Sequence, residues 1–97
     1  MKLLEVIELR TAAGNAGNVD IYLKEWLRET SQEARVARYY HHVSLEPDFC
    51  IHIRYKLDKG ERDPSFTGKQ LSFSLKEFGL VNYSVWVEQE SPDQQEE

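Results

Sequence analysis

The segment that most restricts the fold is residues 49–57, where apolar and polar side chains alternate without interruption. Successive side chains of a β-strand point to opposite faces, so this alternation predicts a strand buried on one face only. Its apolar face contains Phe49, Ile51, Ile53, Tyr55 and Leu57, and its polar face contains Cys50, His52, Arg54 and Lys56. We therefore expect a sheet with one clearly buried face.

The residues before this strand predict a hairpin. They are rich in β-branched and aromatic side chains and lead into a turn-forming stretch, Glu-Pro-Asp, at residues 46–48. A three-residue loop there would place His42 opposite His52. In the same register Tyr40 would lie opposite Arg54, and one interpretation of that pairing is a cation–π contact.

Residues 2–10 predict another strand, which carries apolar side chains on both faces. These are Leu3, Ile7 and Leu9 on one face, and Leu4 and Val6 on the other. Apolar residues on both faces are typical of a strand inside a sheet that is covered on both sides. The cover over the second face therefore has to be explained.

Two amphipathic helices are expected from apolar residues at three- and four-residue spacing. The first would begin after Asn18, which suits an N-cap, and run to about Ala34. The second would begin near Asp63 and Pro64. We expect it to close at Gly79 as a left-handed C-cap.

The last strand is expected at residues 80–88, so the order is strand, helix, strand, strand, helix, strand. This order predicts a ferredoxin-like α+β fold, with both helices on one face of a four-stranded antiparallel sheet. A chain of 97 residues has room for one such domain. We assign the domain to residues 1–89 and expect the acidic tail, residues 90–97, to be disordered.

The sheet face turned away from the helices would be neither fully apolar nor fully polar. It would collect Tyr40, His42, Cys50, His52, Arg54, Asn82, Ser84 and Trp86, together with Leu4 and Val6. Monomers seldom leave such an apolar patch uncovered. A face-to-face homodimer is the simplest cover, and it would enclose a chamber for a small organic ligand.

Charge and hydropathy argue against several kinds of partner. The formal net charge is -5 and the basic residues are spread along the chain, which disfavours nucleic-acid binding. No apolar stretch is long enough for a membrane span, and the charged residues near the start do not fit a signal peptide. The lone Cys50 cannot form an internal disulfide. We therefore expect a cytoplasmic protein with no membrane partner.

The ending SLKEFGLVNYSVWVE, residues 74–88, together with the length and strand order, resembles the dimeric α/β-barrel superfamily. This superfamily includes the antibiotic-biosynthesis-monooxygenase-like (ABM-like) proteins, and the narrower likeness is to small uncharacterised bacterial members. The likeness covers about residues 2–88 and implies a barrel formed by two paired sheets. Members include cofactor-independent oxygenases, haem-degrading enzymes and stress-related proteins, with a ligand chamber between helices and sheet or between the paired sheets.

The residues that serve the haem-degrading members are not matched. Those enzymes rely on an Asn in the first strand, a Trp in the third strand and a His in the second helix. The corresponding segments of this sequence contain none of the three. We therefore expect no haem chemistry and assign no cofactor.

The candidates for a metal site are His42, His52 and Cys50, which would converge on one face in the predicted register. Their spacing is not diagnostic, and no carboxylate supplies a fourth ligand. We therefore interpret them as a polar strand face and assign no metal. Cys50 is interpreted in the same way as a small apolar residue rather than a nucleophile.

A catalytic interpretation makes His52 or His42 a general base. Arg54 would then hold an anionic oxygen and Asn82 would donate a hydrogen bond, while Trp86 stacks on a flat substrate. A cofactor-free oxygenase needs such a base to form a substrate carbanion. The structural alternative makes Arg54 a cation–π partner and Trp86 part of the dimer packing.

Three functions remain open. The first is a small-ligand-binding homodimer with no assigned catalysis. The second is a cofactor-independent monooxygenase acting on an aromatic or polyketide-like compound, and the third is a structural or regulatory protein-interaction module. The polar sheet face favours the first two, whereas a chamber filled by side chains would favour the third.

Overall fold

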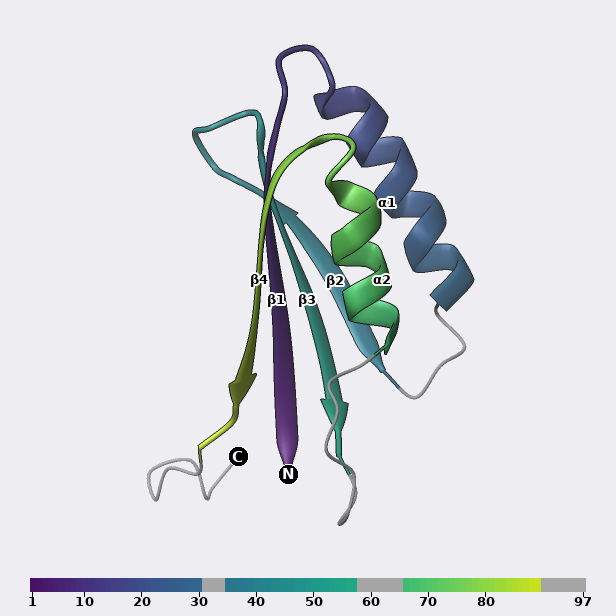
Figure 1. Ribbon diagram of the computed structural model, residues 1–97, viewed down its shortest axis with the longest axis vertical. Coiled ribbons are helices and arrows are strands. Elements are labelled where there is room, and N and C mark those ends of the chain that lie inside the picture. Colours follow the sequence, from purple (N-terminus) through teal and green to yellow (C-terminus); the bar gives the residue numbers. More distant parts are fainter. Residues whose placement is uncertain (31–34, 58–65, 90–97) are drawn as a thin grey trace.

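The computed structural model describes residues 1–30, 35–57 and 66–89, which form four strands and two helices (Figure 1). In chain order these are β1 (Lys2–Thr11), α1 (Ala16–Thr30), β2 (Val36–His41), β3 (Asp48–Lys56), α2 (Phe66–Leu75) and β4 (Gly79–Val87). The expected order of elements is confirmed. The predicted acidic tail, the helix start at Asp63 and Pro64, and the helix end at Ala34 lie outside the described residues.

The strands form one antiparallel sheet in the order β2-β3-β1-β4. β1 lies between β3 and β4, so the strand with two apolar faces is an interior strand, as expected. Both helices pack against the same face of the sheet (Figure 1). The result is a ferredoxin-like α+β arrangement in which neither helix covers the opposite face.

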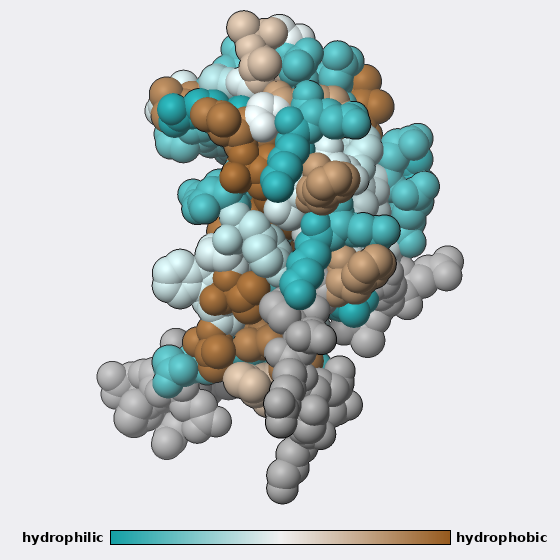
Figure 2. All heavy atoms as spheres, in the orientation of Figure 1, coloured by the Kyte–Doolittle hydropathy of each residue, from teal (hydrophilic) through white to brown (hydrophobic). Residues whose placement is uncertain are grey.

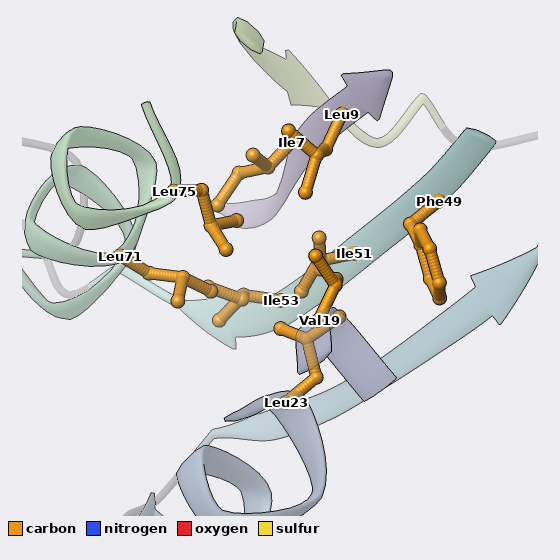
Figure 3. Packing of buried hydrophobic residues seen from close by; sticks show 9 residues of the cluster. All are labelled: Ile7, Leu9, Val19, Leu23, Phe49, Ile51, Ile53, Leu71 and Leu75. Atoms are coloured by element: carbon orange, nitrogen blue, oxygen red, sulfur yellow. The ribbon is translucent and has the colours of Figure 1, made fainter. Parts of the chain in front are cut away.

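An apolar cluster between the sheet and the helices forms the core. Val19 and Leu23 of α1, and Leu71 and Leu75 of α2, meet the odd-numbered residues of β1 and β3 (Figure 3). Full burial of one such side chain contributes about 1.5–3 kcal/mol. The alternation that buries the odd-numbered residues turns their even-numbered neighbours away from the helices, so the predicted facing of β3 is confirmed.

The predicted register of the β2–β3 hairpin is wrong by four residues. Tyr40 pairs with Cys50 rather than with Arg54, so the expected Tyr40–Arg54 cation–π pair does not form. Arg38 is the residue that lies opposite His52. Because four is an even number, every side chain on the strands still points to its predicted face.

The cause of this shift is a connection that spans residues 42–47, longer than expected. The backbone N–H groups of Ser44 and Leu45 both donate to His42 Nδ1, each at 2.9 Å. The ring of His42 therefore organises the connection, and His42 does not lie opposite His52 as predicted. Val43 lies in the same connection and is 96% exposed.

Two predicted helix boundaries are also wrong. α1 begins at Ala16, so Asn18 is already inside the helix and is not its N-cap. Gly14, at a φ of 84°, makes the preceding turn in a conformation that glycine adopts without strain. Gly79 has no positive φ and begins β4 instead of capping α2. Glycine is required there because a Cβ would lie 2.0 Å from the carbonyl oxygen of Arg10.

A polar contact ties α1 to the edge strand β2. The hydroxyl of Tyr39 donates to Asp20 Oδ1 at 2.6 Å, and Asp20 also pairs with Lys24 at 3.0 Å. The hydrogen bond from Tyr39 lowers the pKa of Asp20, while burial and this same contact raise the pKa of Tyr39 to about 12. The contact stabilises the position of the helix over β2.

Candidate functional site

The open face of the sheet consists of the even-numbered strand residues that neither helix covers. The pairing registers arrange them in rows across β2, β3, β1 and β4: Val36, Arg54, Leu4 and Trp86; then Arg38, His52, Val6 and Ser84; then Tyr40, Cys50, Glu8 and Asn82. Trp86 is 60% exposed and Leu80, beyond the last row, is 77% exposed. Figure 2 shows hydrophobic side chains exposed over the lower end of β1 and β4. The expected mixed character of this face is present in the structure.

One end of the open face, near the β2–β3 connection, contains a hollow of about 420 Å³, which we call the upper hollow. Its lining includes Glu8, Arg10, Tyr40, Asp48, Cys50, Leu80 and Asn82. Arg10 donates two hydrogen bonds to Asp48, at 2.9 and 3.1 Å. Asn82 Nδ2 donates to Glu8 Oε1 at 3.1 Å. Arg10 and Asp48 therefore pair with each other, and Glu8 is bonded to the amide of Asn82.

Cys50 lies half-buried in the upper hollow. Burial raises the pKa of its thiol, and the negative charge of Glu8 raises the pKa further. A reactive cysteine needs the opposite, a positive surrounding that favours the thiolate. The interpretation of Cys50 as a small, unreactive side chain agrees with this surrounding.

His52 lies in the middle row of the open face. It is half-buried, and its ring meets the ring of Tyr40 edge-on, with centroids 5.0 Å apart. Burial lowers the pKa of His52 below 6.5, and the positive charge of Arg54 lowers it further. Both effects favour the neutral imidazole, which is the form that can accept a proton.

The opposite end of the open face contains a second hollow, of about 530 Å³, which we call the lower hollow. Its lining includes Lys2, Leu4, Val36, Arg54, Lys56, Trp86 and Glu88. Trp86 Nε1 donates to Ser84 Oγ at 2.9 Å, so the indole N–H is used within β4 and the ring surface remains available. The lower hollow thus combines an exposed aromatic ring with several cationic side chains.

The predicted site residues do not form one site. Tyr40, His42, Cys50 and Asn82 line the upper hollow, Arg54 and Trp86 line the lower hollow, and His52 lies between the two. Asn82 and Trp86 are four residues apart on β4, which corresponds to about 13 Å. Of the four catalytic candidates, only His52 and Arg54 remain neighbours, because both lie on the open face of β3.

Sequence reasoning missed Glu5, a fully buried carboxylate on the covered face of β1. It lies so close to α2 that a Cβ at Gly68 would be 1.6 Å from its Oε1 atom. Burial and the charge of Glu5 raise the pKa of Tyr83 on the neighbouring strand. The available signal was one charged residue at an odd, core-facing position of an apolar strand. We interpret Glu5 as an anchor of α2 on the sheet.

Within residues 1–30, 35–57 and 66–89, no group of three or more His, Cys, Asp or Glu side chains could hold a metal ion. Neither α1 nor α2 is long and apolar enough to span a membrane.

Comparison of the chain with protein-family models, with curated proteins and with solved structures found no match. The likeness to the dimeric α/β-barrel superfamily therefore has the residue pattern of the sequence as its support. That likeness stays a prediction, and the single chain shows a ferredoxin-like α+β arrangement.

Proposed function

We propose that this protein is a homodimer of the dimeric α/β-barrel type, in which two open faces meet and enclose a binding chamber for a small organic ligand. The observation that carries the proposal is the exposure of Trp86, at 60%, on a sheet face that no helix covers. Large exposed apolar patches of this kind mark interaction or ligand surfaces. The cytoplasm, where the free Cys50 stays reduced, is the compartment that we propose.

The polar groups and hollows of the open face support a chamber that holds a ligand. His52 and Cys50 are half-buried rather than packed away, and hollows of about 420 and 530 Å³ lie on either side of them. Ligand sites are concave, mostly apolar and contain a few polar groups that orient the ligand. A pure interaction module would instead fill this space with side chains of the partner.

Light scattering on the purified chain tests the dimer. We expect twice the monomer mass of 11.4 kDa. Trp86→Lys should give a monomer because it places a charge in the apposed faces. Phe73→Lys is the matched control: Phe73 is also an exposed aromatic residue, at 73%, but it lies on α2, so its substitution should not affect the mass. A monomeric wild-type chain would contradict the proposal.

Ligand binding is tested with N-phenyl-1-naphthylamine, a neutral dye whose fluorescence increases in apolar sites. The wild-type dimer should bind it saturably, and Trp86→Lys should abolish binding. The Phe73→Lys control should bind it normally. A stable dimer that takes up no dye would favour the structural or regulatory interaction module over a ligand-binding protein.

A second candidate function is a cofactor-independent monooxygenase acting on an aromatic or polyketide-like compound. The observation that favours it is the neutral imidazole of His52 beside the Arg54 guanidinium. His52 would remove a proton from an activated CH₂ group, and Arg54 would stabilise the resulting anion. The carbanion would then react with O₂, giving a carbonyl group and one water molecule without an external reductant.

Oxygen uptake with anthrone, an aromatic ketone with an acidic CH₂ group, tests this second function. The rate should increase with pH with a midpoint below 6.5, because the pKa of His52 is lowered. His52→Gln should abolish the enzymatic rate while binding of N-phenyl-1-naphthylamine is retained. An unchanged rate in His52→Gln would exclude His52 as the base and leave only the ligand-binding function.

A further inference from the structure

We infer that the lower hollow selects an aromatic carboxylate, whose ring stacks on Trp86 while Arg54, Lys2 and Lys56 bind its anionic group. The inference rests on the proposed function, because it names the ligand class of the same open face. It is carried by three observations: the net positive charge of the lower hollow, the lack of partners for its three cations among the described residues, and the row of paired residues that joins Arg54 to Trp86.

The lower hollow is positively charged, although the chain as a whole is acidic. The lower hollow is lined by the cations of Lys2, Arg54 and Lys56 and by one carboxylate, Glu88, for a net charge of +2. The whole chain has a net charge of -5. A local excess of positive charge in an acidic chain creates an attractive potential for small anions. The overall composition of the chain does not account for this local positive charge.

The cations of the lower hollow are also free to bind a ligand. Within the described part of the chain, Lys2, Arg54 and Lys56 form no ion pair and no side-chain hydrogen bond with one another or with a neighbouring residue. Arg10 in the upper hollow is different, because both of its hydrogen bonds go to the carboxylate of Asp48. A guanidinium group offers a planar pair of donors that matches a carboxylate. Arg54 is the residue placed to use that geometry on a ligand.

The same row of the sheet supplies a surface for the aromatic ring. Arg54 on β3 and Trp86 on β4 both pair with Leu4, which lies between them on β1. Two strand spacings separate their backbones by about 10 Å, a gap that an aromatic acid spans when both side chains reach toward it. The indole N–H of Trp86 is already bonded to Ser84, so the ring offers a stacking surface rather than a donor. Leu4 and Val36 provide an apolar floor.

The test compares binding of 2-naphthoate with binding of 2-naphthalenemethanol, a neutral compound of nearly the same shape, to the full-length protein by calorimetry at pH 7. We expect the carboxylate to bind about tenfold more tightly than the alcohol, as charge-assisted hydrogen bonds to Arg54 allow. Arg54→Gln should remove this preference and leave the affinity for the alcohol unchanged. Lys69→Gln, a charge removal on the exposed outer surface of α2, is the control and should alter neither affinity.

Several outcomes would overturn the inference. Equal affinity for the two compounds would show that the site does not select an anion, while the neutral ligand-binding function would stand. Loss of the preference in Arg10→Gln but not in Arg54→Gln would place the anion in the upper hollow. Failure of both compounds to bind would also overturn it, and N-phenyl-1-naphthylamine binding and the dimer mass would then decide the proposed function separately.

Discussion

The two faces of β3 differ in how far their side chains are buried. On the covered face, Ile51 and Ile53 are 0% and 1% exposed and pack beneath both helices. On the open face, His52 and Arg54 stand on either side of Ile53 in the sequence, and they are half-buried and exposed, respectively. Substitutions on the covered face should therefore change the free energy of unfolding, whereas those on the open face should change association and binding. The following predictions test this division.

The largest effect is expected from Ile51→Ala. Removing a fully buried Ile side chain costs about 2–5 kcal/mol, which is a large part of the stability of a small domain. Arg54→Ala on the open face of the same strand should alter the stability of the folded chain by less than about 0.5 kcal/mol. Urea unfolding of both variants measures the difference. Similar losses for the two variants would mean that the faces are not divided in this way.

A somewhat smaller loss is expected from Gly68→Ala. The added Cβ would lie 1.6 Å from Glu5 Oε1, so α2 or Glu5 must shift, at a cost of about 1–3 kcal/mol. Gly17→Ala is the matched control, because it lies in α1 and its Cβ would meet no atom within 4 Å. In Gly17→Ala the higher helix propensity of alanine should stabilise the chain by up to about 1 kcal/mol. Effects of the same sign in thermal unfolding would contradict this account of Gly68.

Tyr39→Phe should produce an intermediate loss that depends on pH. It removes the hydrogen bond to Asp20, worth about 0.5–1.5 kcal/mol near neutral pH. The pKa of Tyr39 is raised from 10.0 to about 12, so folding favours its neutral form. The stability from this contact is present below pH 10 and is lost between about pH 10 and 12. Wild-type protein should therefore lose more stability over that interval than Tyr39→Phe, as measured by urea unfolding at each pH.

The smallest effect is expected from Arg10→Gln in the upper hollow. In its ion pair with Asp48, 64% of the Arg10 side chain and 21% of the Asp48 side chain are accessible to solvent. Ion pairs open to solvent contribute little to stability and are weakened by salt. The loss seen in urea unfolding should shrink further in high salt. A loss as large as that of Ile51→Ala would show that the open face is also a source of stability.

Much of this fold could be predicted because the relevant signals are local. The two-residue period of residues 49–57 determines which side chains face the helices, and an error of four residues in the register leaves that result unchanged. The loop length could not be predicted, because it depends on two backbone N–H groups that bond to the ring of His42. The four-residue shift in register moved His42 away from His52.

The burial of the Glu5 carboxylate could not be predicted from the sequence. Hydrophobic patterning identifies Leu3, Ile7 and Leu9 as core residues and treats Glu5 as an interruption. Its burial depends on the position of α2, because Gly68 leaves space for the carboxylate. The upper and lower hollows could not be predicted from any single segment either. Each is lined by residues of several strands, so the two hollows are defined only when the four strands are arranged in the sheet.

Acrylamide quenching of Trp86 fluorescence tests the central claim most directly. In Trp26→Phe, Trp86 is the only tryptophan, and a single chain leaves it 60% exposed. If two open faces meet, quenching should be slow at high protein concentration and become faster as dilution dissociates the dimer. Fast quenching at every concentration, equal to that of a free tryptophan amide, would contradict a covered open face.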